Sequence, residues 1–126
     1  MSGVRPTGPG ILMIAMIASC ASVSSPHPIS SKIDIDLGNV NLEGLRGPPH
    51  GLRAVHYEFC IPTGKDEEVR SIDPTAQFMP GSRGRIGCAG DQILVVGNTH
   101  QRSYRQVLER LAALDYVSRI VENFFE

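Results

Sequence analysis

The chain has 126 residues, enough for one small domain, and its formal net charge is −1. Hydrophobic residues make up 41% and charged residues 20% of the sequence, a balance that permits a buried core and argues against a wholly disordered chain. Proteins that bind nucleic acids usually carry a strong basic excess, which this chain lacks, so we expect no nucleic-acid partner. Tryptophan does not occur and aromatic residues are few, which predicts a core built mainly from Ile, Leu and Val.

Residues 1–19 have the order of features of a secretory leader. Arg5 and the amino terminus supply positive charge, no acidic residue occurs, and residues 11–18 form an unbroken apolar run. This run is shorter than the about 20 apolar residues that a membrane-crossing helix needs, and it has the length of a signal-peptide core. We therefore predict a signal peptide over residues 1–19.

The end of this leader resembles the lipobox of bacterial lipoprotein precursors. Ile17, Ala18 and Ser19 place a branched apolar residue and two small residues directly before Cys20. The resemblance implies that Cys20 receives a diacylglycerol thioether, that the leader is cut before it, and that the new amine is acylated. Several acyl chains together anchor a protein stably to a bilayer. The alternatives are an ordinary secretory leader cut at Ala18 or Ala21, with Cys20 incidental, and an amphipathic segment that is not cleaved.

The residue after the lipidated position directs sorting in lipoproteins of Gram-negative bacteria. An aspartate there retains the protein at the inner membrane, whereas this chain has Ala21. The resemblance therefore implies a lipid anchor in the outer membrane, facing the periplasm, if the source is Gram-negative. Removal of the leader would take Arg5 with it and change the formal charge from −1 to −2.

Residues 20–51 are predicted to be a flexible, lipid-anchored tether. Ser, Pro, Gly and Asn are frequent there, and residues 24–28 and 47–51 are poor formers of helix and strand. Within the tether, residues 33–37 alternate apolar and acidic side chains with a period of two, which predicts a strand. This would be an edge strand added to the domain, or a strand that forms only on a partner.

Residues 52–126 alternate between strand-like and helix-like patterns and predict one α+β domain. Apolar residues at every second position predict a strand over 54–61. Acidic residues near the start of 64–72, and Pro74 after it, predict a helix. A loop with several glycines then leads into a short strand predicted at 85–88.

The second half of this domain begins with a turn and a buried strand. Residues 89–91 have the chemistry of a hairpin turn, and the apolar run after them predicts a strand over 92–97. A helix follows, capped by Asn98 or Ser103, with one apolar stripe made by Tyr104, Val107, Leu108, Leu111 and Ala112. Residues 116–125 are predicted to be a strand, although their apolar positions also fit a helical spacing.

The resulting order is strand, helix, strand, strand, helix, strand. It predicts a ferredoxin-like split β-α-β sandwich, a topology that carries no implication of an iron–sulfur cluster. In that topology the first strand lies antiparallel beside the third. The end of the first strand, which carries Cys60, then meets the start of the third, which Cys88 precedes.

Cys60 and Cys88 are predicted to form a disulfide. If Cys20 is lipidated, these two cysteines are the pair that remains, in an oxidising compartment where disulfides persist. Free thiols, a redox pair and metal thiolates are the alternatives. The two cysteines lack the Cys-x-x-Cys spacing typical of a redox pair. Neither has histidines near it in the sequence, as a metal site would require.

The segment 81–87 is the strongest candidate for ligand binding. Its glycines leave backbone N–H groups accessible, and Arg83 and Arg85 have the geometry to pair a phosphate or carboxylate in bidentate fashion. We expect His100, Arg102 and Arg105 to join them, because the second helix would begin nearby. The segment lacks the ending of a phosphate-binding loop and the glycine spacing of a dinucleotide site. A flexible loop with solvated arginines is the alternative.

No motif in the sequence predicts catalysis, a metal or a cofactor. The four histidines, His27, His50, His56 and His100, lack ligand spacing, and no nucleophile-elbow motif occurs around Ser103 or any other serine. We therefore expect a non-catalytic binding or accessory module for another envelope protein, which uses the sheet face or the arginine loop. The alternative is an enzyme or enzyme subunit that binds an anion or small ligand through Arg83 and Arg85.

Overall fold

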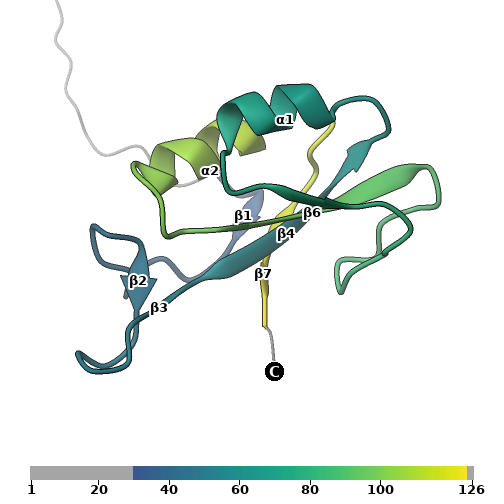
Figure 1. The fold of residues 1–126 in the computed structure, drawn as a ribbon. Coiled ribbons are helices and arrows are strands. Elements are labelled where there is room, and N and C mark those ends of the chain that lie inside the picture. The colour runs from purple at the N-terminus through teal and green to yellow at the C-terminus, as the bar shows by residue number, and fades with distance from the viewer. Residues whose placement is uncertain (1–29, 125–126) are drawn as a thin grey trace, which may run out of the picture.

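We describe residues 30–124 of a computed structural model of the chain (Figure 1). The predicted leader, the lipobox and Cys20 lie outside these residues, as does Phe125, the last residue of the strand predicted at 116–125. No helix between residues 30 and 124 combines the length and the apolar composition that crossing a bilayer requires.

The architecture is α+β, with a five-stranded sheet, two helices on one of its faces and a separate two-stranded sheet (Figure 1). Along the larger sheet the strand order is β1-β7-β4-β6-β5. Strand β4 is antiparallel to both β6 and β7, β5 is antiparallel to β6, and β1 is parallel to β7. The elements in chain order are β1 (Ile33–Asp34), β2 (Leu45–Arg46), β3 (Arg53–Ala54), β4 (His56–Pro62), α1 (Asp66–Ile72), β5 (Gln77–Met79), β6 (Gln92–Asn98), α2 (Tyr104–Ala112) and β7 (Ile120–Asn123).

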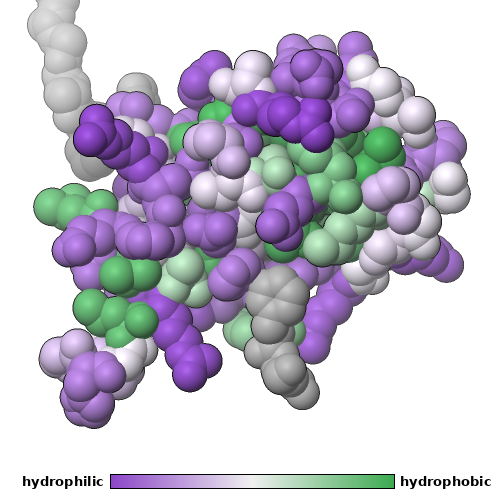
Figure 2. Space-filling view, in the orientation of Figure 1, coloured by the Kyte–Doolittle hydropathy of each residue, from purple (hydrophilic) through white to green (hydrophobic). Residues whose placement is uncertain are grey.

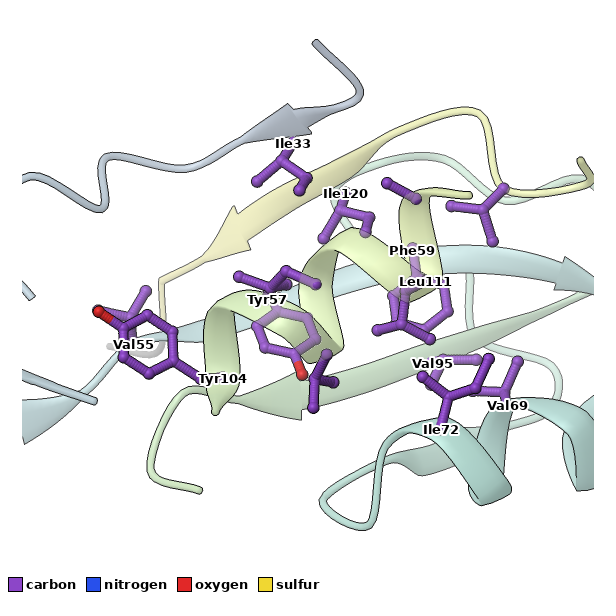
Figure 3. Close-up of a cluster of buried hydrophobic side chains, with 14 of the residues drawn as sticks. Ile33, Val55, Tyr57, Phe59, Val69, Ile72, Val95, Tyr104, Leu111 and Ile120 are labelled. Atoms are coloured by element: carbon purple, nitrogen blue, oxygen red, sulfur yellow. The ribbon is translucent and has the colours of Figure 1, made fainter. Parts of the chain in front are cut away.

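The main core lies between the sheet and the helices. Successive side chains of a strand point to opposite faces, so the alternating apolar residues of β4 all face the helices. Tyr57, Phe59 and Ile61 are fully buried there, and Figure 3 shows Tyr57 and Phe59 grouped with Leu111 of α2. Each such side chain contributes roughly 1.5–3 kcal/mol when it leaves water. The stripe predicted for α2 is buried along its whole length: Tyr104, Val107, Leu108, Leu111 and Ala112.

Helix α2 begins one residue after one of the two predicted caps. Ser103 stands at the cap position, but it has a φ of 53° and its side chain makes no capping hydrogen bond. Asn98 instead uses its side-chain oxygen to accept the backbone N–H of His100, which shapes the turn between β6 and the helix. Both residues lie at this junction, and neither caps the helix in the predicted way.

The short strand predicted at 85–88 is wrong. Gly84 and Gly87 have φ values of 66° and 80°, and the backbone N–H groups of Gly87 and Cys88 both bond to the carbonyl of Arg83. The backbone thus turns on itself here, and the N–H groups of Gly87 and Cys88 are used within the turn, not in a sheet ladder. The strand beside β6 is β5, in which Phe78 pairs with Val95.

Residues 30–54, which we call the N-terminal arm, lie against the domain, although composition places most of them in a tether. Strand β1 covers the first part of the predicted strand at 33–37 and pairs with β7. Leu37 and Val40 are 5% and 8% exposed, because both side chains belong to the main core. The Tyr104 hydroxyl of α2 also donates to the carbonyl of Val40. Burial of these two residues outweighs the linker-like composition around them.

A buried polar network joins α1, β4 and the loop before α2. The Asp73 side chain is fully buried and accepts a 2.5 Å hydrogen bond from the Tyr57 hydroxyl. The backbone N–H and hydroxyl of Thr75 donate to its other oxygen, as does the amide of Gln101. Burial, followed by the negative charge of Asp73, raises the pKa of Tyr57 above its ordinary value of 10.0. The Asp73 charge is thus satisfied by several donors inside the fold.

Candidate functional site

The predicted disulfide between Cys60 and Cys88 is confirmed. The two residues are bonded, with their Cα atoms 5.6 Å apart and 28 positions apart in sequence. Strand β4 is antiparallel to β6, so Cys60 near the end of β4 lies beside the segment that enters β6, where Cys88 is found. Cys88 is fully buried against Leu94 and Val96, on the sheet face opposite the helices.

The loop at residues 80–91 is held against that same face by a buried carboxylate. Glu58 is 1% exposed and accepts hydrogen bonds from the backbone N–H of Ile86 at 2.7 Å and from the Asn123 amide at 2.8 Å. A Cβ at Gly84 would lie 2.6 Å from a Glu58 oxygen, so the loop backbone passes directly over this side chain. The loop therefore covers part of the sheet face that the sequence offered as a partner surface.

The two arginines of the predicted anion loop have structural contacts. The Arg83 side chain donates through Nε to the carbonyl of Cys88 at 3.1 Å, which closes the turn before β6. The Arg85 guanidinium lies 6.0 Å from the centre of the Phe124 ring. Arg83 is thus bonded within its own loop, and Arg85 lies near the end of β7.

The other three predicted site residues lie beside the N-terminal arm. His100 places Nδ1 3.2 Å from the carbonyl oxygen of Glu43, and Arg105 donates to the carbonyl of Leu37. His100 and Arg102 share a hollow of about 310 Å³ with Leu42 and Glu43. The structure thus brings His100 and Arg102 together, and Arg105 belongs to a helix on the face opposite Arg83 and Arg85. The five residues do not form one anion site.

A larger cleft, which sequence reasoning missed, lies between the β2–β3 hairpin and the end of β7. Its volume is about 700 Å³, and its polar lining comes from Arg46, Arg53, His56, Glu122 and Asn123. Arg46 and Glu122 are 76 positions apart in sequence, and each has an ordinary surface-like context along the chain. No local pattern could have joined them, because the cleft forms only when the hairpin packs beside the last strand.

Arg46 and Glu122 form a two-pronged ion pair inside this cleft. Nη1 of Arg46 lies 3.2 Å from Oε1 of Glu122, and Nη2 lies 2.5 Å from Oε2. The side chains are 30% and 12% exposed, so the pair is partly shielded from solvent. The hydrogen bond that Arg46 donates to Glu122 holds the pKa of the Arg46 guanidinium above its ordinary value. Glu122 thus fixes the arginine in place and neutralises it.

Between residues 30 and 124, no three His, Cys, Asp or Glu side chains are grouped so that they could hold a metal ion. Comparison with protein-family models, curated proteins and solved structures gives no match to this chain.

Proposed function

We propose that the protein is a lipid-anchored lipoprotein of the cell envelope that serves another envelope protein as a small, non-catalytic binding or accessory module. The anchor would be Cys20, with the leader removed, and the location the periplasmic side of the outer membrane in a Gram-negative cell. The Cys60–Cys88 disulfide supports a compartment outside the cytoplasm, because such bonds persist where the environment is oxidising. The charge, apolar run and lipobox of residues 1–20 support the anchor.

We further propose that β4 to β7 with the two helices form the ferredoxin-like sandwich expected from the sequence. The order β7-β4-β6-β5 within the sheet, and the antiparallel pairing of each neighbouring pair, support this topology. The N-terminal arm would then be an addition to that sandwich, joined to it through β1. Such a fold is compatible with many functions, so the function has to be argued from the surface.

The observation that carries the binding role is the nearly complete exposure of one large apolar side chain, Leu42. In residues 30–124 the exposed large hydrophobic residues are Leu42, Leu52 and Phe124, with 98%, 41% and 55% of their surfaces accessible. All three lie on the N-terminal arm or at the neighbouring end of β7, and Figure 2 shows hydrophobic atoms protruding at the end that carries β2 and β3. A large apolar side chain that is almost wholly exposed gains the most free energy when a partner removes it from water.

Leu42 is the most exposed of these residues, and its backbone is firmly held. The Thr99 hydroxyl donates to the carbonyl of Gly44 at 2.5 Å, and a Cβ at Gly44 would overlap the Thr99 carbonyl. The Asn41 side chain accepts the backbone N–H groups of Glu43 and Leu45. A side chain on an ordered loop loses little conformational freedom when a partner covers it. We call Leu42, Glu43, His100 and Arg102 the tip surface and propose that it contacts the partner.

Affinity capture from native envelopes tests this proposal. The tagged protein should retain a specific partner, and Leu42→Ser should lose it, because the leucine would bury its whole side chain in the contact. Leu52→Ser is the matched control, since it makes the same change in the same arm outside the tip surface. A Leu42→Ser variant that captures the partner as well as the parent protein would refute the role of the tip surface.

The anchor has its own test in the same preparation. The intact mass should correspond to a chain that begins at Cys20 and carries acyl groups, and Cys20→Ser should remain unacylated with its leader uncut. A parent protein that keeps its leader, or that lacks acyl mass, would refute the anchor without bearing on the tip surface. A correctly anchored protein that captures no partner would refute the binding role alone.

A further inference from the structure

The cleft beside β7 contains two arginines that face each other across the β2–β3 hairpin. Arg46 of β2 and Arg53 of β3 are direct partners in the register of this two-stranded sheet. Like charges in that position repel one another and destabilise a hairpin unless an anion lies nearby. The hairpin therefore concentrates positive charge at one wall of the cleft.

The protein supplies a counter-charge for one of these arginines. Both carboxylate oxygens of Glu122 accept hydrogen bonds from Arg46, so Glu122 is not available as a bidentate partner for Arg53. Arg53 is exposed, lines the cleft, and takes part in no ion pair with any residue between 30 and 124. Glu122 is the carboxylate that lines the cleft, and Asp36 adds negative charge near Arg46 from outside it, so both negative charges act on Arg46 and no carboxylate between residues 30 and 124 pairs with Arg53.

The rest of the lining suits the apolar part of a small molecule. Pro48 and the half-exposed ring of Phe124 contribute to the walls. The volume of about 700 Å³ lies inside the range of roughly 300–1,000 Å³ typical of small-molecule sites, which combine apolar walls with a few polar groups. A guanidinium beside an apolar wall selects for an anionic group carried on an apolar body.

We propose that this cleft is a binding site for a small organic anion, a carboxylate or phosphate ester on an apolar or aromatic body. Arg53 is the primary contact for the anionic group, and Arg46 is a second contact that Glu122 partly neutralises. The site is independent of the proposed partner-binding role, because the tip surface uses Leu42, His100 and Arg102, which do not line this cleft.

Titration of the purified protein, as the cell produces it, with benzoate, phenyl phosphate and benzyl alcohol tests the proposal. Amide chemical shifts in NMR spectra should report saturable binding of one or both anions at residues of the β2–β3 hairpin and the end of β7. Benzyl alcohol has the same ring without the charge and should bind at least about tenfold more weakly, because it lacks a charge-assisted hydrogen bond. The two anions distinguish a carboxylate ligand from a phosphate ester. Equal binding of the alcohol and the anions would overturn the proposal.

Two variants are expected to change the affinity in opposite directions. Arg53→Gln removes the unbalanced charge and should weaken anion binding about tenfold. Glu122→Gln removes the internal competitor for Arg46 and should strengthen binding. A merely structural role for these residues would not produce effects of opposite sign.

Arg70→Gln is the matched control, since Arg70 is an exposed arginine on α1 that pairs with Glu67 outside the cleft. It should leave the affinity unchanged. Urea unfolding of each variant shows whether the hairpin stays folded. If Glu122→Gln loosens the hairpin, the comparison of anion affinity between Arg53→Gln and Arg70→Gln still tests whether Arg53 binds the anion. Equal affinities for those two variants, or shifts confined to the loop with Arg83 and Arg85, would overturn the proposal.

Discussion

Reduction of the Cys60–Cys88 bond should lower the free energy of unfolding by about 3.6 kcal/mol. This value follows from the chain-entropy model for a closed loop of 28 residues at 25 °C. The folded state should change little, because Ile86 still bonds to Glu58 and Arg83 still bonds to the carbonyl of Cys88. The loss therefore comes from the larger freedom of the unfolded chain. It is a large share of the about 5–15 kcal/mol that stabilises a typical domain.

Urea denaturation followed by far-UV circular dichroism, with and without a thiol reductant, measures this loss. The Cys20→Ser background ensures that the reductant acts on one pair of cysteines only. The slope of the unfolding free energy against urea should also rise, because an unfolded chain without the cross-link exposes more surface. The double variant Cys60→Ala and Cys88→Ala should lose at least as much, since a buried side chain is also truncated.

Two results would refute this reasoning. A loss below about 1 kcal/mol would mean that the unfolded chain is already compact around these residues. Loss of the amide signals of residues 80–91 in the reduced protein, with the rest of the spectrum intact, would mean that the bond holds the loop in the folded state. Glu58 and Arg83 would then be too weak to do so alone.

The remaining predictions concern the core, the buried network and the covering loop. Tyr57→Phe leaves one oxygen of the buried Asp73 without its donor and should cost roughly 1.5–3 kcal/mol in urea unfolding. Because the pKa of Tyr57 is raised in the folded state, its contribution to stability should be complete below pH 10.0 and should fall as the pH rises above that value. The melting temperature measured across alkaline pH should show this fall, and Tyr57→Phe should remove part of it. Leu111→Ala should cost about 2–5 kcal/mol by calorimetry, and a smaller loss would mean that the core collapses around the gap. Gly84→Ala places a Cβ at positive φ against Glu58 and should cost at least about 1 kcal/mol in urea unfolding; a neutral result would show that the loop can shift.

The parts of the fold that sequence predicts well are those with a long periodic signal. The apolar stripe from Tyr104 to Ala112 predicts α2, and the alternation around Tyr57 and Phe59 predicts β4, because in each case the period itself reports which face is buried. The disulfide follows from the antiparallel placement of the first and third strands. These inferences need only local pattern and the topology that the patterns imply.

The misplaced strand shows where such patterns are ambiguous. Ile86 and Cys88 are apolar for a reason other than strand pairing, since they pack into a small second core with Leu94 under the sheet. Strand β5 has three residues, too few to show an alternation. A short apolar segment therefore indicates that its side chains are buried, but does not indicate whether the backbone forms a β-strand or a turn.

The N-terminal arm and the cleft were hidden for a different reason. Val40 contacts Tyr104 from 64 positions away, and Arg46 contacts Glu122 from 76 positions away. Composition describes the neighbours of a residue along the chain, whereas these contacts depend on which distant element passes by. The candidate anion site could be found only after the hairpin and β7 were placed side by side.

The pairing of β1 with β7 also sets the order in which the fold can be completed during synthesis. The Lys32 side chain bonds to the carbonyl of Leu114, 82 positions later, and Ile33 pairs with Ile120 in the last strand. The arm therefore has no finished edge to join until nearly the whole chain has been synthesised. Strand β1, the first strand in the described part of the chain, is thus among the last to be paired in the sheet.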